Sequence, residues 1–276
     1  YYPKLNRKFI KAKFNGIAFN TSQIKKDYIF FAIKGSNYNG NSFIKNAVKN
    51  GSKIIISENV KERIEDNILY LKNKNPRKLL AEFASKINYI RPNNLVAVTG
   101  TNGKSSTVWM ARHLLRGFGV EVLALGTLGV FVGADEQPTT HTTPDPDYLF
   151  QMMALARKKG IGTLLMEVSS HSIAHAKVSP VWFDFLVFTG FSRDHLDFHK
   201  SLNDYLECKL KLFRYQLKDG GASLIHVSLV EKFKARGMTW DRTYGYNEAK
   251  KYNIVSDWQV EATSDKKALI KFKNET

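Results

Sequence analysis

The stretch Val98-Thr99-Gly100-Thr101-Asn102-Gly103-Lys104-Ser105-Ser106 decides the fold of the chain. It follows an apolar run at 95–98 and opens a helical pattern over 104–115, so it joins a buried strand to a helix. Glycines let backbone N–H groups turn inward, and the helix N-terminus adds partial positive charge. In this setting Lys104 is expected to reach phosphate oxygens and Ser105 to ligate Mg²⁺. The spacing G-x-x-G-K-S is shorter than the full phosphate-loop pattern because position 98 is Val, and a plain glycine turn is the alternative.

Strands and helices alternate on both sides of this stretch. Apolar runs predict strands at 29–33, 53–57, 67–71, 95–98, 120–125, 163–168, 183–188 and 222–227. Helical spacing predicts helices at 43–48, 76–87, 104–115, 147–159 and 202–215. This alternation is typical of an α/β fold with mostly parallel sheets covered on both faces. The polar stretch 91–94 divides a small α/β domain at 1–92 from a larger phosphate-loop domain at 93–276. In the tail, strands are expected at 258–262 and, as an edge strand, at 267–272.

Composition excludes several classes of protein. Of the 276 residues 43 % are hydrophobic, an ordinary globular value that argues against disorder. No run of about 18 uncharged apolar residues occurs, so we expect no membrane span. The single cysteine, Cys208, excludes an intrachain disulfide and favours a cytoplasmic location. The chain opens with Tyr1, not Met, and we expect it to be a piece of a longer protein.

The positive charge is concentrated in the first third of the chain. Residues 1–95 hold 19 Lys and Arg against 6 Asp and Glu, whereas residues 96–276 hold 23 against 19. A basic domain typically meets a nucleotide, a nucleic acid or an acidic surface. Compositional drift toward Lys, Asn and Ile is the alternative. No zinc-finger spacing or aromatic-interleaved basic ribbon supports nucleic acid, so no nucleic-acid partner is expected.

Polar residues follow two of the predicted strands in the second domain. Glu167 ends the strand at 163–168, at the edge where open α/β sheets bind ligands, and is a candidate Mg²⁺ ligand. The next strand runs into Ser192-Arg193-Asp194-His195-Leu196-Asp197-Phe198-His199, which holds candidate metal or nucleotide ligands. A solvated glutamate and a polar loop with a helix cap are the respective alternatives.

One lysine falls on a core-facing stripe. In the helix 202–215 a single face carries Leu202, Tyr205, Leu206, Lys209, Leu212 and Phe213. The head of Lys209 is therefore directed toward the interior or the edge of a site. Buried lysines are rare unless they are paired or modified, and a lysine that extends its head to the surface is the alternative.

These motifs together resemble those of the Mur ligases, most closely the MurE type. The resemblance spans nearly all of residues 17–216 and rests on the order of the phosphate loop, the segments 142–145, 167–171 and 192–199, and the set Tyr205, Lys209 and Phe213. The segments 20–22 and 29–40 look like the family's UDP-sugar-binding domain.

The resemblance implies an ATP-dependent amide-bond ligase of peptidoglycan precursor synthesis. ATP, with Mg²⁺, would phosphorylate the terminal D-Glu of UDP-N-acetylmuramoyl-L-alanyl-D-glutamate, and the amine of a diamino acid would displace the phosphate. The family's corresponding lysine reacts with CO₂ to form a carbamate, which implies that Lys209 becomes an N6-carboxylysine.

The resemblance also assigns roles to residues. Those implied to bind ATP are Gly100, Thr101, Asn102, Gly103, Lys104, Ser105 and Ser106. Those implied to ligate Mg²⁺ are Ser105, Glu167, His195 and the carbamate of Lys209, and the implied catalytic residues are Lys104, Glu167, His195 and Lys209. Those implied to bind the sugar peptide are Phe19, Thr21, Ser36, Asn37, Tyr38, His141, Thr142, Thr143, Ser169, His175 and Lys177.

Several positions depart from the family pattern. His175 and Lys177 stand where the family usually has Gln and Arg, and His141 stands where Asn is common. Asn20-Thr21-Ser22 replaces Asp-Ser-Arg, and 225–228 replaces an Asn-x-Asp-Asp segment. The family's third domain, which binds the incoming amino acid, has no counterpart, so we expect little turnover from this chain alone. The alternatives are a MurF, MurC or folylpolyglutamate-synthetase-like ligase, or a non-catalytic basic protein that binds nucleotides or nucleic acid.

Overall fold

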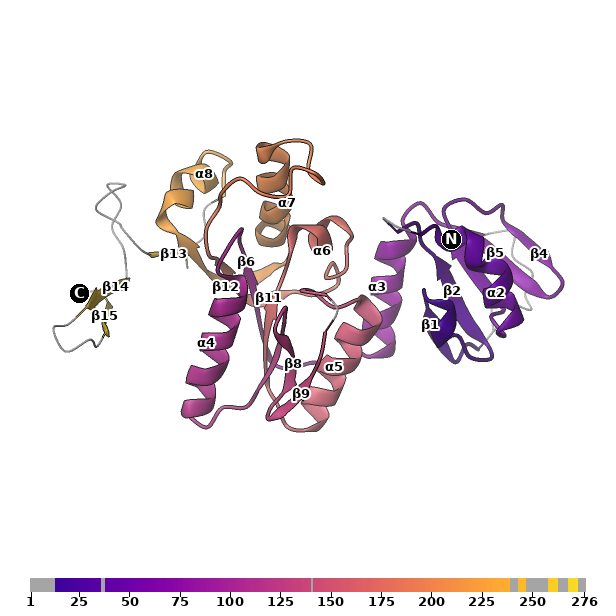
Figure 1. Cartoon of the computed structure of the whole chain (residues 1–276), viewed down its shortest axis with the longest axis horizontal. Helices are drawn as coiled ribbons and strands as arrows, with labels where there is room; N and C mark the ends of the chain where they lie inside the picture. The colour runs from indigo at the N-terminus through magenta and orange to yellow at the C-terminus, as the bar shows by residue number, and fades with distance from the viewer. Residues whose placement is uncertain are drawn as a thin grey trace. The chain divides into compact units, whose positions relative to one another are not determined.

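The computed structural model divides the chain into two compact units, with the boundary between Ile87 and Asn88. It describes residues 13–35, 38–139, 141–238, 243–246, 258–262 and 268–272 (Figure 1). The polar stretch 91–94 lies just inside the second unit, where the first strand of the large sheet begins at Asn94. Among the described residues, no helix is both long enough and apolar enough to cross a membrane.

The first unit is a five-stranded sheet covered on both faces. Its strand order is β1-β2-β3-β5-β4, with β4 antiparallel at the edge and the other strands parallel. The strands are β1 (Gly16–Ala18), β2 (Tyr28–Ala32), β3 (Ile54–Ser57), β4 (Arg63–Glu65) and β5 (Ile68–Lys72).

Side-chain alternation along β2 and β3 builds two apolar clusters in this unit. Phe30 and Ile55 pack with Ala47 of α2 (Ile44–Lys49) on one face. On the other face, Phe31 packs with Leu80 of α3 (Pro76–Ile87). Successive residues of a strand point to opposite faces, so each strand supplies both clusters.

The second unit is built on an eight-stranded sheet of order β13-β12-β11-β6-β10-β7-β8-β9. Its strands are β6 (Asn94–Thr99), β7 (Val122–Gly126), β8 (Gly129–Val132), β9 (Asp135–Gln137), β10 (Thr163–Glu167), β11 (Phe183–Phe188), β12 (Leu217–His226) and β13 (Thr243–Tyr246). All pair in parallel except β8 and β9, which form an antiparallel edge. The strands that carry the predicted site, β6, β10 and β11, are neighbours at the centre.

Helices cover this sheet on both faces. They are α4 (Lys104–Gly117), α5 (Pro146–Lys158), α6 (Ser170–Ala174), α7 (Leu202–Tyr215) and α8 (Val230–Lys234). Helix α4 packs against β6, β7 and β10, where Val108 joins the cluster of Val98, Val122 and Leu165. Leu123 alternates with these residues along β7 and is also fully buried, so the opposite face is covered as well.

The predicted α/β class is confirmed, and most predicted elements lie within two residues of the observed ones. The strands β1, β4, β8, β9 and β13 and the short helices α6 and α8 were not predicted. One prediction about α7 is wrong: Leu202 is 43 % exposed, because it lies in the first turn, before the helix meets the core. In the tail, β14 (Trp258–Ala262) and β15 (Ala268–Phe272) form an antiparallel pair.

Candidate active site

The phosphate loop, residues Gly100–Gly103, connects the end of β6 to the first turn of α4. Gly100 and Gly103 have φ values of +150° and +84°, which L side chains rarely adopt. A Cβ on Gly100 would also lie 2.0 Å from Oγ1 of Thr189. The loop therefore needs glycine at both positions. The loop leads directly into the N-terminus of a 14-residue helix, and backbone amides in this setting bind phosphate.

Two lysines donate to one carbonyl oxygen of this loop. Nζ of Lys104 donates to the carbonyls of Gly100 at 3.0 Å and Thr101 at 2.8 Å. Nζ of Lys209 donates to the same Gly100 carbonyl at 3.0 Å, and this lysine is only 1 % exposed. The alternative of a surface-reaching Lys209 head is therefore excluded.

Burial weakens the charge of both lysines, and repulsion from Lys104 weakens that of Lys209 further. Burial, followed by the positive charge of Lys104, lowers the pKa of Lys209 to about 7. Burial also lowers the pKa of Lys104, against the opposing effects of Glu167 and Asp194. Near neutral pH a large share of Lys209 is thus the uncharged amine, the form of lysine that acts as a nucleophile.

A buried carboxylate lies beside the first turn of α4. Glu167, at the end of β10, is 1 % exposed and accepts hydrogen bonds from Oγ of Ser105 at 2.9 Å and from N of Thr127 at 2.8 Å. A Cβ on Gly126 would lie 2.1 Å from Oε1 of Glu167, so the Glu167 side chain needs a glycine at position 126. Hydroxyl and carboxylate oxygens are ligands that Mg²⁺ prefers, and the pair fits such an ion.

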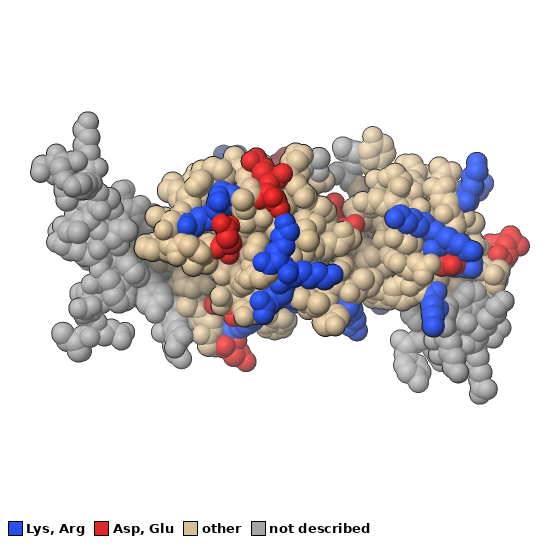
Figure 2. Space-filling view, turned by 90° about the horizontal axis from the view of Figure 1, so that it is seen from below, with Lys and Arg blue, Asp and Glu red and all other residues tan. Residues whose placement is uncertain are grey.

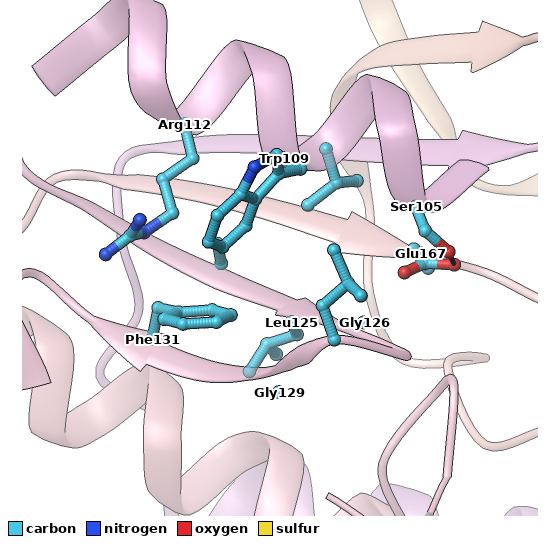
Figure 3. Close-up of a pocket in the computed structure, with 11 residues that line it drawn as sticks. Ser105, Trp109, Arg112, Leu125, Gly126, Gly129, Phe131 and Glu167 are labelled. Carbon is cyan, nitrogen blue, oxygen red and sulfur yellow. Dashed lines mark hydrogen bonds between the residues drawn. The ribbon is translucent and has the colours of Figure 1, made fainter. Parts of the chain in front are cut away.

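The carboxylate borders an apolar hollow between α4 and the β7–β8 hairpin (Figure 3). Ser105 and Glu167 lie together at one end of it, and Trp109, Arg112 and Phe131 line the other. The Arg112 guanidinium stacks over the Phe131 ring at 4.4 Å. Because the lining beside Glu167 is largely apolar, charges there are screened less than at an open surface.

Histidines and a tyrosine form a wall beside Lys209. The ring of Tyr205 lies 4.7 Å from Nζ of Lys209 and 5.8 Å from the ring of His195. His195 has a left-handed φ of +52°, and its backbone N donates to Oδ1 of Asp194 at 2.8 Å. The ring of His171 lies 5.0 Å from that of His195. Tyr205 thus brings His195 and Lys209 to one place.

Burial governs the protonation of the other two histidines of this wall. It lowers the pKa of both His171 and His199, and for His199 it outweighs the carboxylate of Asp204, 3.6 Å from Nδ1. Both are therefore neutral at pH 7. Within the part of the chain that the structure describes, no three His, Cys, Asp or Glu side chains converge on a metal site.

Three of the predicted sugar-peptide residues lie at the same sheet edge. Oγ1 of Thr142 accepts a hydrogen bond from Thr127 at 3.0 Å. Thr143 is 2 % exposed; its hydroxyl donates to the Glu167 carbonyl at 3.0 Å and accepts from N of Ser169 at 3.1 Å. Ser169 caps α6. The Thr143 hydroxyl thus links Glu167 to the start of α6.

The positions that depart from the family pattern are placed differently. Nζ of Lys177 forms an ion pair with Oδ1 of Asp145 at 2.7 Å, and both side chains are mostly buried. His175 ends α6 and contacts the ring of Phe198, with ring centroids 5.6 Å apart. His141 is exposed, and its carbonyl accepts from the Thr139 hydroxyl at 2.9 Å. Lys177 is thus balanced by a carboxylate of its own domain.

In the first unit the predicted residues follow β1 and β2. Phe19 packs on the cluster around Phe31, and the carbonyl of Thr21 accepts from Nδ2 of Asn50 at 3.1 Å. Tyr38 is 74 % exposed. The predicted residues Ser36 and Asn37 lie outside the described residues. Lys and Arg side chains are prominent on the visible surface of this unit (Figure 2).

Thr127 and Thr189 were missed by sequence reasoning although both contact predicted site residues. Thr127 donates to Glu167, and Thr189 lies against Gly100. A signal for Thr127 was present, because Gly126-Thr127-Leu128-Gly129 separates two apolar runs and is typical of a hairpin turn. Thr189 directly follows the predicted strand 183–188, at the edge where ligands bind.

Comparison with known proteins gives a consistent result. A model described as "Mur ligase middle domain" matches residues 98–276, and one described as "Mur ligase family, catalytic domain" matches residues 13–87. Two relatives are named UDP-N-acetylmuramoyl-L-alanyl-D-glutamate–2,6-diaminopimelate ligase. The one from Caldanaerobacter subterraneus is 33 % identical over 86 % of this chain and 50 % of its own length. The one from Rickettsia montanensis is 36 % identical over 82 % and 48 %.

Solved structures agree on the fold. A structure of a ligase with the same name as these relatives has a TM-score of 0.70 at 21 % identity, covering 93 % of this chain and 55 % of its own. MurF ligase from Thermotoga maritima in complex with ADP has a TM-score of 0.57 at 19 % identity, covering 89 % and 52 %. The chain spans about half the length of the curated relatives it matches. Because the middle-domain model alone covers well over half of its residues, this chain belongs to the Mur ligase family.

Proposed function

We propose that this chain carries the nucleotide-binding and sugar-peptide-binding parts of an ATP-dependent ligase of the MurE type. Its reaction would join a diamino acid to UDP-N-acetylmuramoyl-L-alanyl-D-glutamate in peptidoglycan precursor synthesis. The observation that carries the proposal is the 2.9 Å contact between Ser105 and Glu167 directly after a glycine-shaped phosphate loop. The printed names of the relatives support the choice of substrate.

The phosphate loop would hold the triphosphate of ATP. The residues involved are Gly100, Thr101, Asn102, Gly103, Lys104, Ser105 and Ser106. Lys104 would leave its carbonyl partners on the loop and donate to the β- and γ-phosphates instead. Its charge and the helix N-terminus would then stabilise the charge that builds up during phosphoryl transfer.

Ser105, Glu167, His195 and a carbamate on Lys209 would hold Mg²⁺. When bound, the ion neutralises phosphate charge and aligns the transferred group. The buried Lys209, with its pKa of about 7, supplies the uncharged amine that carbamate formation requires. Addition of CO₂ to the uncharged amine would form one N–C bond and release one proton, and the neutral side chain would become an anion.

The sugar peptide would lie along the edge formed by Thr142, Thr143, Ser169, His175 and Lys177, with His141 beside it. Its D-Glu carboxylate would attack the γ-phosphate, and ADP would leave. The amine of the diamino acid would then attack the acyl phosphate and release inorganic phosphate. The chain's own residues orient these groups and exclude water, because the reacting atoms belong to the substrates.

The first domain, at 1–92 in the sequence-based division, would bind the UDP moiety through Phe19, Thr21, Ser36, Asn37 and Tyr38. Its excess of lysines suits a diphosphate. The domain at 93–276 would carry the chemistry. A cytoplasmic location fits the two proposed nucleotide substrates, ATP and the UDP-linked sugar peptide. It also fits a chain whose single cysteine forms no disulfide.

Titration calorimetry with Mg²⁺-ATP tests the nucleotide assignment. We expect saturable binding that weakens by about two orders of magnitude in Lys104→Ala, because a half-buried cation at the phosphates is lost. Lys158→Ala, an exposed lysine at the end of α5, is the matched control and should bind normally. Absence of ATP binding by the wild-type chain would exclude the proposal.

Two competing functions are separated by ligand choice. A folylpolyglutamate-synthetase-like ligase would bind a folate in preference to UDP-N-acetylmuramoyl-L-alanyl-D-glutamate, and a MurF-like ligase would prefer the tripeptide product. A non-catalytic nucleic-acid-binding protein would bind arbitrary DNA with a steep dependence on salt concentration. We expect neither folate binding nor such a salt dependence.

A further inference from the structure

We infer that Thr189, the residue after β11, is a positioning residue that sets the anion-binding geometry of the phosphate loop. The inference rests on the proposed nucleotide-binding function. Thr189 bonds to both ends of the loop. Its backbone N donates to the Thr99 carbonyl at 2.9 Å, and its hydroxyl donates to the Asn102 carbonyl at 2.5 Å.

The side chain of Thr189 packs against both glycines of the loop. A Cβ on Gly100 would lie 2.0 Å from its Oγ1, and a Cβ on Gly103 would lie 3.5 Å from its own Cβ. The two glycines are therefore packed on the threonine from opposite ends of the loop. Glycine at these positions serves this packing as well as the left-handed φ of each residue.

This packing fixes the direction of two backbone amides. Every peptide bond among the described residues is trans, so each C=O and the N–H of the same peptide point in opposite directions. Because the carbonyls of Thr99 and Asn102 point toward Thr189, the N–H groups of Gly100 and Gly103 point away from it. Two donors thus face the side on which a phosphate would lie.

The residues after Thr189 hold the middle of the loop in the same way. The N–H of Thr101 donates to the carbonyl of Gly190 at 2.9 Å. The Thr101 hydroxyl accepts from N of Ser192 at 3.1 Å. The segment 189–192 therefore contacts successive residues of the loop, and only Thr189 does so through a hydroxyl that can be removed without a change of shape.

Substitution of the hydroxyl separates positioning from general stability. Thr189→Val keeps the volume and removes the donor, Thr189→Cys offers only a weak donor, and Thr189→Ser keeps the hydroxyl. Thr163→Val makes the same change at the start of β10, the opposite end of the sheet, and is the matched control. Binding of Mg²⁺-ATP and of tripolyphosphate is measured by calorimetry, and unfolding temperature is measured in parallel.

We expect Thr189→Val to weaken both ligands about tenfold, because a misdirected loop affects the phosphates and not the base. Thr189→Cys should behave similarly, whereas Thr189→Ser and Thr163→Val should stay within about twofold of wild type. Thr189→Val should lose affinity even if it and Thr163→Val lower the unfolding temperature by the same amount.

Unchanged affinity in Thr189→Val would overturn the inference while leaving the proposed function intact. If that variant fails to fold, equal affinities of Thr189→Ser and Thr189→Cys would overturn it instead. A wild-type chain that binds neither ATP nor tripolyphosphate would overturn the proposed function itself. Loss of ATP binding with unchanged tripolyphosphate binding would also contradict the inference, because it would place the effect at the base.

Discussion

The two units of this protein distribute charge in opposite ways. The first third of the chain holds most of the excess positive charge, yet no Lys, Arg, Asp or Glu among its described residues is buried. The second unit is nearly balanced, yet it buries Arg112, Asp147, Glu167 and Lys209. Exposed lysines cost little to maintain, whereas a buried ion costs several kcal/mol unless it is compensated. Burial of charge, and not its amount, therefore marks the site.

The strand ends of the two sheets show the same contrast. In the first unit, β3 ends in a neutral pair in which Oγ of Ser57 donates to Oδ1 of Asn41 at 2.5 Å. In the second unit, neighbouring strands end in a phosphate loop, a buried Glu167 and Thr189. A parallel sheet thus becomes a candidate active site where adjacent strand ends supply complementary groups.

The largest effect is expected from Gly100→Ala. The added Cβ would collide with Oγ1 of Thr189 at 2.0 Å, and the φ of +150° would be strained. Strain and overpacking together should lower the free energy of unfolding by about 4 kcal/mol. Denaturant unfolding measures this. Gly162→Ala, where a Cβ has nothing within 4 Å, is the control; equal losses in both variants would show that the loop is not tightly packed.

A smaller effect, with a distinctive pH dependence, is expected from Lys209→Met. The pKa of Lys209 is about 7 in the folded protein and about 10.5 when unfolded, so the unfolded chain binds more protons between these values. The lysine therefore destabilises the fold fully below pH 7, and its penalty disappears as the pH rises to about 10.5. Lys209→Met should be more stable than wild type by several kcal/mol at pH 6 and by little near pH 10.5.

Removal of the neighbouring charge tests the cause of this shift. Lys104→Met should raise the pKa of Lys209, because Lys104 is the main charged group that lowers it. The pKa is read from NMR of the labelled lysine.

A stability difference between Lys209→Met and wild type that does not change with pH would contradict the burial of an ionisable amine.

Much of the fold could be predicted because apolar periodicity reports directly on buried strands. β11 and α7 begin and end where predicted, and both carry regular apolar patterns. Strands β8, at 129–132, and β9, at 135–137, were missed because segments of four and three residues are too short to show a period. For the site, the strand-end position of Glu167 was readable, since strand ends meet at one edge.

The hydrogen-bond partners could not be predicted. That Lys104 and Lys209 donate to one carbonyl depends on how α7 packs beside the loop, and residues 105 positions apart in the sequence carry no local signal of this. The pairing of Lys177 with Asp145 is of the same kind. Sequence reasoning located the residues and the packing determined their partners.

The ion pair of Asp145 and Lys177 is expected to contribute a moderate amount. Both side chains are mostly buried, at 26 % and 15 % exposure, so Asp145→Asn leaves the ammonium without its counter-ion. We expect a loss of about 1.5 kcal/mol in unfolding free energy. Asp135→Asn breaks the exposed pair with Lys159 in the same unit and is the control. An equal loss in both variants would remove the distinction between buried and exposed pairs.

The smallest effect is expected from the surface of the first unit. Lys78 and Glu82 lie one turn apart on α3, with Nζ 4.0 Å from Oε1 and exposures of 57 % and 45 %. Lys78→Ala should change the unfolding free energy by no more than about 0.3 kcal/mol, since water screens the pair and alanine favours the helix. The measurement is a denaturant midpoint at low and high salt, and the small difference should vanish at high salt. A loss above about 1 kcal/mol would show that the basic first unit depends on its charges as the second unit does, and the contrast between the two would fail.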